Sequence, residues 1–194
     1  MQQAKKAYRV MLLGGGNSAG YFARTFIEKG GLGGDLCIIT DEAAVSYERP
    51  ALTKPYLAVQ NPARLPGFHS CVGGGGARQE SGWYAEKGIT YMTGVRVSGV
   101  DLSAKECTTE GGEKIGFEKL VIATGARPMT LKDFKTPGAE LKGLHYIRDV
   151  KDTDDFLADM AACKEAGKTH AVVIGGGYIG LECACGLLNH GMKV

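Results

Sequence analysis

The pattern Gly-x-Gly-x-x-(Ala or Gly) occurs twice in this chain, once near each end. In the dinucleotide-binding fingerprint the first glycine permits a tight turn and the second lets a pyrophosphate approach the backbone. The third small residue lets a helix pack closely on a strand. A single match is weak evidence, because glycines also make ordinary turns. The two copies consist of Gly14, Gly16 and Ala19, and of Gly175, Gly177 and Gly180.

Both copies lie between an expected strand and an expected helix. The apolar run 8–13 precedes the first turn, and residues 18–28 follow it with helical spacing. The second copy repeats this order with a strand at 171–174 and a helix at 178–188. The repeated context favours two nucleotide sites, and two nucleotides bound end to end indicate a flavin reduced by a nicotinamide.

An acidic pair follows the next expected strand after the first copy. This strand covers residues 36–40, is expected to run parallel to 8–13, and leads into Asp41 and Glu42. A dinucleotide needs an acceptor for its ribose hydroxyls at this position. We expect Glu42 to fill that role, with Asp41 as the alternative.

The remaining segments predict an α/β fold in two parts. Residues 43–82 are rich in turn formers, with short helical turns near 52–57, and a short helix begins near Trp83. A helix is expected at 152–165. We predict a Rossmann-like FAD-binding domain over 1–148, with a parallel sheet and a small β-meander, followed by the incomplete start of a second Rossmann-like NAD(P)-binding domain over 149–194. The other expected strands are 89–92, 96–102, 106–109, 114–117 and 119–123.

Composition narrows the function classes. The 23 basic and 21 acidic residues leave a net charge of +2 without a basic block, so nucleic acid is not an expected partner. No run approaches the roughly 20 apolar residues of a membrane-spanning helix. The six cysteines form no CxxC or CxxxxC pair, which favours reduced thiols in a cytoplasmic compartment, with an organelle not excluded.

Two stretches resemble the monodehydroascorbate reductases, a plant and algal flavoprotein family. The stretch YERPALTK at 47–54 is shared in looser form with ferredoxin and rubredoxin reductases, whereas RLPGFHSCVGGGG at 64–76 is more specific. The strand that ends at Ala123, Thr124 and Gly125 is similar to the segment that closes the flavin domain in reductases of the glutathione-reductase fold. The resemblance covers almost all of this chain and less than half of the family's length.

The resemblance implies an activity and its cofactors. NADH would reduce FAD, and the flavin would pass single electrons to monodehydroascorbate radicals to give ascorbate. NADPH is not excluded, and catalytic residues are expected beyond Val194. The resemblance places FAD at Gly14, Gly15, Gly16, Asn17, Ser18, Ala19, Glu42, Arg49, Lys54, Val97, Ala123, Thr124, Gly125 and Arg148. It places NADH at Gly175, Gly177, Tyr178, Ile179, Gly180 and Glu182.

Several alternatives stay open at the level of the sequence. Arg148 could instead form a surface ion pair with Asp149 or Asp152, and His69 is expected to be structural rather than catalytic. The chain could serve a small iron–sulfur protein as its reductase, or it could be a non-catalytic flavin-binding fragment. As a fragment it would leave the apolar face of helix 178–188 uncovered.

Overall fold

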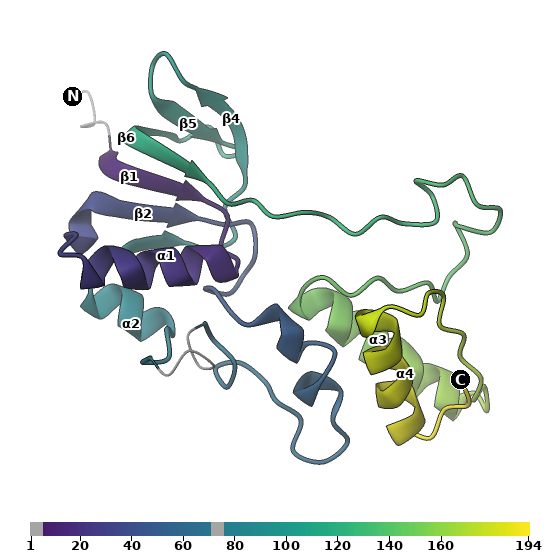
Figure 1. Cartoon of the computed structure of the whole chain (residues 1–194). Helices are drawn as coiled ribbons and strands as arrows, with labels where there is room; N and C mark the ends of the chain where they lie inside the picture. Colours follow the sequence, from purple (N-terminus) through teal and green to yellow (C-terminus); the bar gives the residue numbers. More distant parts are fainter. Residues whose placement is uncertain (1–5, 71–75) are drawn as a thin grey trace. The chain divides into compact units, whose positions relative to one another are not determined.

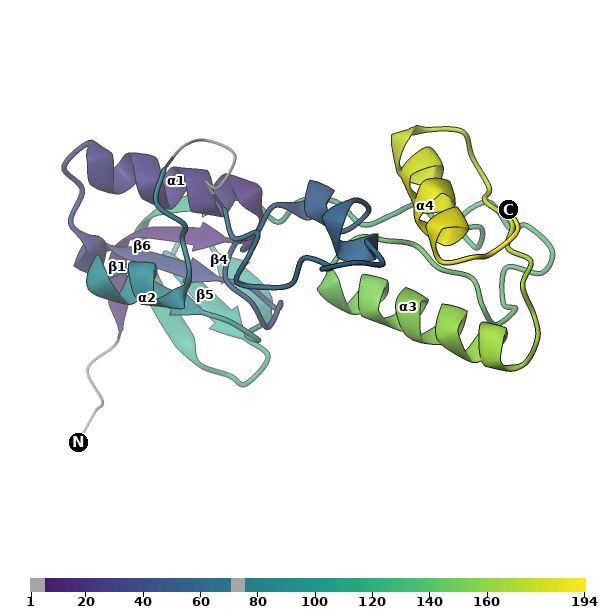
Figure 2. The ribbon, with the colours of Figure 1, turned by 90° about the horizontal axis from the view of Figure 1, so that it is seen from below.

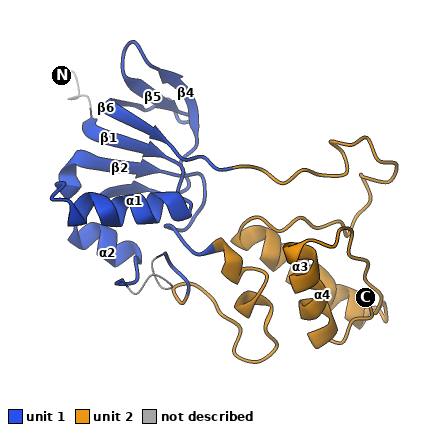
Figure 3. Cartoon of the chain, in the orientation of Figure 1, with its two compact units in different colours: residues 1–48, 68–125 blue, residues 49–67, 126–194 orange. Residues whose placement is uncertain are grey.

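The computed structural model describes residues 6–70 and 76–194. Cys71 and the glycines at 73–75 of the more specific signature lie outside the described residues. The chain forms two compact units, shown in Figure 3. Unit 1 comprises Met1–Glu48 and Phe68–Gly125, and unit 2 comprises Arg49–Gly67 and Ala126–Val194.

Unit 1 contains a six-stranded mixed sheet in the order β3-β2-β1-β6-β5-β4 (Figure 1). β3, β2, β1 and β6 pair in parallel, and β6, β5 and β4 form an antiparallel meander. The predicted parallel pairing of the first two strands is therefore confirmed. The strands are β1 (Ala7–Leu13), β2 (Leu36–Ile39), β3 (Thr90–Met92), β4 (Val97–Asp101), β5 (Glu106–Thr109) and β6 (Lys114–Ile122).

The prediction of separate strands at 114–117 and 119–123 is wrong, because β6 is continuous. Its first residues pair with β5, and from Gly116 onward it pairs with β1. Beyond Gly116, the edge of β6 that pairs with β5 in its first residues has no partner strand among the described residues. The adjacent charges of Glu118 and Lys119 are exposed there, so they interrupt the apolar pattern without interrupting the strand.

The sheet of unit 1 buries apolar side chains on both faces, which explains the almost uninterrupted apolar runs of its central strands. On one face, Leu12 and Ile38 pack with Ala23 of α1 (Asn17–Glu28) and Tyr84 of α2 (Ser81–Glu86). On the other face, strand residues such as Met11 pack with buried side chains of β5 and β6. These two layers hold the carboxyl ends of the parallel strands in place.

Unit 2 contains the two longer helices α3 (Val150–Glu165) and α4 (Tyr178–Asn189) and two short 3-10 turns, η2 (Arg49–Ala51) and η3 (Pro55–Leu57). Another such turn, η1 (Gly33–Asp35), belongs to unit 1. Met160 of α3 and Leu187 of α4 share a small core with Met192. None of the described helices is long and apolar enough to cross a bilayer.

The expected strand at 171–174 is wrong. Residues 171–174 form no strand: the isolated parallel bridge beside them joins His170 to Lys193, and the Ala171 N–H donates to the Lys193 carbonyl oxygen at 2.7 Å. A strand needs a partner along its length, and unit 2 has no named strand among its described residues. Val172 and Ile174 are accordingly 86% and 71% exposed. As expected, helix α4 also leaves large apolar side chains uncovered, with Tyr178 87% exposed.

Candidate functional site

The carboxyl ends of β1, β2 and β6 meet at one edge of the unit 1 sheet. The Gly14 N–H donates to the carbonyl oxygen of Ile39 at 2.8 Å, and the Ala123 N–H donates to that of Leu13 at 2.8 Å. Ligands of open α/β sheets bind at this edge. The structure thus brings the first glycine turn, the end of β2 and the segment 123–125 together within unit 1.

The first glycine turn has no room for side chains. Gly14 has φ of +106°, and a Cβ atom on it would lie 2.2 Å from the carbonyl oxygen of Ala123. A Cβ atom on Gly15 would lie 2.6 Å from Cβ of Thr40. Both positions therefore require glycine, the first for its backbone conformation and for space. The result is a bare backbone cradle at the strand ends.

Helix α1 begins directly after this cradle with its first-turn N–H groups available. Gly16 is the N-cap and provides no side-chain cap. The Ala19 N–H already donates to the Gly16 carbonyl oxygen at 2.9 Å, so the donors without an acceptor inside the helix are the N–H groups of Asn17 and Ser18. The side chain of Asn17 does not cap the helix; its Nδ2 donates a hydrogen bond to Glu48 Oε2 at 2.9 Å. Ser18 is exposed, and Ala19 is fully buried where the helix meets the core. Such a helix end attracts phosphate.

Among the described residues of unit 1, Glu42 is held by hydrogen bonds, whereas Asp41 is not. The Tyr47 hydroxyl donates to Glu42 Oε2 at 2.5 Å, and the Glu42 N–H donates to Thr40 Oγ1 at 3.2 Å. Asp41 instead forms an exposed ion pair with Arg96 at 3.6 Å. The fixed carboxylate of Glu42 favours the predicted ribose contact.

The other predicted FAD residues of unit 1 lie in and after its strands. Val97 begins β4, and its side chain packs against the core that includes Leu13. Thr124 and Gly125 follow β6, are exposed, and continue the chain with φ of +72° at Gly125. Their polar backbone groups are therefore accessible at the carboxyl side of the sheet.

The second glycine turn, in unit 2, has the same backbone conformation as the first. Gly175 has φ of +105°, and the N-cap Gly177 has φ of −76° and ψ of 174°, close to the −74° and −171° of Gly16. A Cβ atom on Gly180 would lie 2.3 Å from the carbonyl oxygen of Gly175. The turn and helix start therefore form without a neighbouring strand. Tyr178 and Ile179, both exposed, open helix α4.

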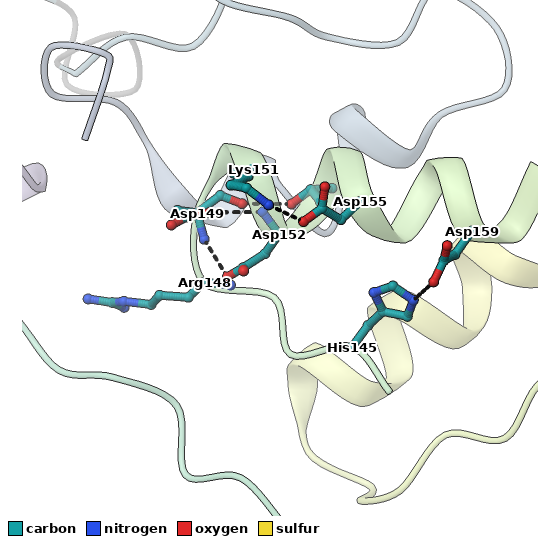
Figure 4. Close-up of polar contacts among 8 residues, drawn as sticks. His145, Arg148, Asp149, Lys151, Asp152, Asp155 and Asp159 are labelled. Carbon is teal, nitrogen blue, oxygen red and sulfur yellow. Dashed lines mark hydrogen bonds and ion pairs between the residues drawn. The ribbon is translucent and has the colours of Figure 1, made fainter. Parts of the chain in front are cut away.

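Arg148 does not form the ion pair that the sequence left as an alternative. Its N–H donates to Asp152 Oδ2 at 2.9 Å, and Asp149 and Asp152 form a capping box at the start of α3. Figure 4 shows the Arg148 guanidinium extending away from these carboxylates, and no ion pair of Arg148 occurs among the described residues. Arg49 Nη1 donates to the Arg148 carbonyl oxygen at 2.8 Å. Two predicted FAD contacts therefore lie together in unit 2.

Lys54 and Glu182, which the resemblance assigned to different cofactors, form an ion pair in unit 2. Lys54 Nζ lies 2.8 Å from Glu182 Oε1, and Thr53 Oγ1 donates to Glu182 Oε2 at 2.5 Å. The hydrogen bonds from Lys54 and then Thr53 lower the pKa of Glu182. Thr53 was missed at the sequence level, because nothing in its own segment indicates a partner on α4.

His69 and the two most buried described cysteines have structural environments. His69 is buried, and its Nδ1 lies 3.1 Å from the carbonyl oxygen of Ser46, as expected for a structural histidine. Cys37 and Cys107 are fully buried free thiols, and burial raises the pKa of Cys37 to about 12. Within the described ranges no cluster suited to a metal ion occurs.

Comparisons with known proteins agree with this geometry. A monodehydroascorbate reductase of Solanum lycopersicum is 46% identical over 98% of this chain and 43% of its own length. A chloroplastic/mitochondrial one of Arabidopsis thaliana is 48% identical over 90% of this chain and 34% of its own length. This chain thus spans less than half of these relatives. Rice relatives are named cytosolic and peroxisomal.

Solved structures give the same fold. NADH:rubredoxin oxidoreductase from Clostridium acetobutylicum matches with a TM-score of 0.71 and 26% identity, over 97% of this chain and 43% of its own. The pyridine nucleotide-disulphide oxidoreductase family matches residues 8–194, which implies a flavin and a pyridine nucleotide as cofactors. From its two glycine-rich turns, each followed by a helix, and from this match, the chain belongs to the pyridine nucleotide-disulphide oxidoreductase family.

Proposed function

We propose that this chain is the flavin-binding part, with the start of the nicotinamide domain, of an enzyme that uses NADH and FAD to reduce the monodehydroascorbate radical to ascorbate. The predicted domains 1–148 and 149–194 are part of this proposal. The observation that carries it is the side-chain-free backbone at Gly14 and Gly15, directly before the start of α1, which no side chain caps, in a chain 46% identical to a monodehydroascorbate reductase. A flavin accepts two electrons from a nicotinamide and releases them singly, which suits a radical acceptor.

In unit 1 the chain's own residues would bind and orient FAD. The N–H groups at the start of α1 would bind the pyrophosphate, because backbone donors and the helix dipole both favour negative charge. Glu42, held by Tyr47, would accept hydrogen bonds from the adenosine ribose. Thr124 and Gly125 would offer backbone groups at the same strand edge, as would Val97 at the start of β4.

In unit 2 the glycine turn and helix start at Gly175–Gly180 would bind the NADH pyrophosphate in the same way. Arg49 and Lys54 would bring positive charge to the flavin, since a guanidinium or an ammonium stabilises an electron-rich ring or a phosphate. Arg148, whose guanidinium extends away from the α3 carboxylates, is available for the same purpose. Glu182 would hold Lys54 in place.

The assay that tests this proposal follows NADH oxidation by the FAD-loaded full-length enzyme that contains this chain, with enzymatically generated monodehydroascorbate radical. We expect NADH loss that depends on the radical and exceeds the loss with NADPH. NADH loss with ferredoxin or rubredoxin, and none with the radical, would overturn the proposal. Binding of FAD without reduction of either acceptor would instead support a non-catalytic flavin-binding polypeptide.

A reductase for a small iron–sulfur protein is the second candidate. The fold match to NADH:rubredoxin oxidoreductase favours it, and so does the looser form of the motif at 47–54. The rubredoxin oxidoreductase is 26% identical to this chain, whereas the tomato monodehydroascorbate reductase is 46% identical over a similar length of it, so we rank the ascorbate reaction first.

We propose a cytoplasmic location, which cell fractionation tests.

A further inference from the structure

The segment Arg49–Gly67 carries two of the proposed flavin contacts but has little regular structure of its own. It contains only the turns η2 and η3, and it lies beside α3 and α4 in both views of unit 2 (Figures 1 and 2). Side chains at its centre are nonetheless fixed, with Tyr56 only 2% exposed and Leu57 1%. The position of Lys54 therefore depends on how this centre is anchored.

Tyr56 is held at its ring, its hydroxyl and its carbonyl. The hydroxyl donates to Asp154 Oδ1 on α3 at 2.6 Å. The Arg64 guanidinium carbon lies 3.9 Å from the centre of the Tyr56 ring, and Arg64 Nη1 donates to the Tyr56 carbonyl oxygen at 3.0 Å. Burial, with the Asp154 hydrogen bond as second cause, raises the pKa of Tyr56 to about 12. The hydroxyl thus remains a donor at every physiological pH.

Helix α4 contacts the same segment along one stripe. Glu182 and Gly186 of α4 and His190, which caps its C-terminus, are spaced four residues apart, so they lie on one side of the helix. Glu182 binds Thr53 and Lys54, and His190 Nε2 lies 3.0 Å from the Leu57 carbonyl oxygen. A Cβ atom on Gly186 would lie 2.9 Å from Leu57 Cδ1, so glycine allows this close approach.

We propose that Tyr56 is a positioning residue that, through its hydrogen bond to Asp154, holds Thr53 and Lys54 in register against Glu182. Tyr56 lies two residues from Lys54, and the intervening Pro55 stiffens the link because its ring fixes φ. An anchored Tyr56 thereby fixes the end of the segment that presents the lysine ammonium. The importance of this placement for catalysis rests on the proposed contact of Lys54 with the flavin. The placement of Lys54 and Thr53 against Glu182 does not depend on that proposal.

The test measures the side-chain carboxyl pKa of Glu182 by NMR in the 194-residue chain without cofactor. We expect Tyr56→Phe, which keeps the ring but removes the hydroxyl, to raise the Glu182 pKa toward that of an ordinary glutamate, because Lys54 and Thr53 leave the carboxylate. Asp154→Ala should do the same. Asp154→Asn keeps an acceptor oxygen and should preserve the lowered pKa.

The matched control is Tyr8→Phe, which removes a hydroxyl bonded to Thr90 Oγ1 at 3.1 Å in unit 1 and should leave the Glu182 pKa unchanged. Far-UV circular dichroism identifies any variant that has lost α3 or α4. A Glu182 pKa that is unchanged in a folded Tyr56→Phe variant would overturn the positioning role. Failure to bind FAD would instead overturn the proposed function, because the pKa readout uses no flavin.

Discussion

Alanine substitutions at two glycines with the same backbone conformation separate the cost of backbone strain from the cost of a steric clash. Gly14 and Gly175 have φ of +106° and +105°. A Cβ atom on Gly14 would lie 2.2 Å from the Ala123 carbonyl oxygen, whereas one on Gly175 would meet nothing within 4 Å. Replacing each by alanine introduces the same positive-φ strain, and only Gly14→Ala adds a clash with the backbone of Ala123, directly after strand β6.

The size of the expected difference follows from these two effects. Holding alanine at this φ costs about 1–3 kcal/mol. Overpacking beside a backbone that cannot rotate away costs about 1–3 kcal/mol more at Gly14. The lower entropy of the unfolded chain with alanine affects both variants alike and cancels. We therefore expect a loss of about 2–6 kcal/mol for Gly14→Ala and about 1–3 kcal/mol for Gly175→Ala.

Urea denaturation followed by the fluorescence of Trp83 measures this loss in unit 1. Trp83 is the single tryptophan and packs against the core that α1 also joins. With a slope of about 2 kcal/mol per molar, Gly14→Ala should lower the urea midpoint by about 1–3 M. Because Gly175 belongs to unit 2, the loss for Gly175→Ala is followed by the circular dichroism of the helices of that unit, and its urea midpoint should fall less. An equal or larger shift for Gly175→Ala would refute the argument from close approach.

Three further predictions concern other parts of the chain. Asp149→Ala removes the capping box with Asp152 and should lower the free energy of unfolding of α3 by about 0.5–2 kcal/mol in a thermal melt followed by circular dichroism. The pKa of Glu182 is lower in the folded chain, so its pairing with Lys54 stabilises at neutral pH and is lost as pH falls through the folded pKa. The melting temperatures of wild type and Glu182→Gln should therefore converge in acid, and a constant gap would contradict this. Cys37, with its pKa near 12, should resist iodoacetamide at pH 8 in the folded chain, and rapid labelling by mass spectrometry would show that its burial is wrong.

Local pattern was enough to predict most of unit 1. The apolar run before Gly14 and the alanines after it predict β1 and α1, because the hydrophobic period changes from strand to helix at the glycines. The strand break predicted near Glu118 was wrong, since two charges in sequence say nothing about whether a neighbouring strand ends there. Which strands pair along the edge of β6 is decided by the tertiary fold, and the local sequence pattern carries no information about it.

Unit 2 shows the same limit more strongly. The sequence of 171–174 suits a strand, yet these residues form none and only the preceding His170 bridges Lys193, because strand formation depends on a neighbour as well as on propensity. The sequence also gives no reason to pair Lys54 with Glu182, 128 positions apart. The four-residue spacing of Glu182, Gly186 and His190, which line one side of α4 and its C-cap, is a signal that could have indicated a row of contacts there.

Isothermal titration of FAD into the chain tests the central claim, that the cradle at Gly14 with Glu42 at the end of β2 forms the flavin nucleotide site. We expect binding to the wild type, a loss of about tenfold in affinity for Glu42→Ala, equivalent to about 1.4 kcal/mol, and no change for Asp41→Ala. A wild-type chain that binds no FAD, or an Asp41→Ala variant that loses more affinity than Glu42→Ala, would contradict the account.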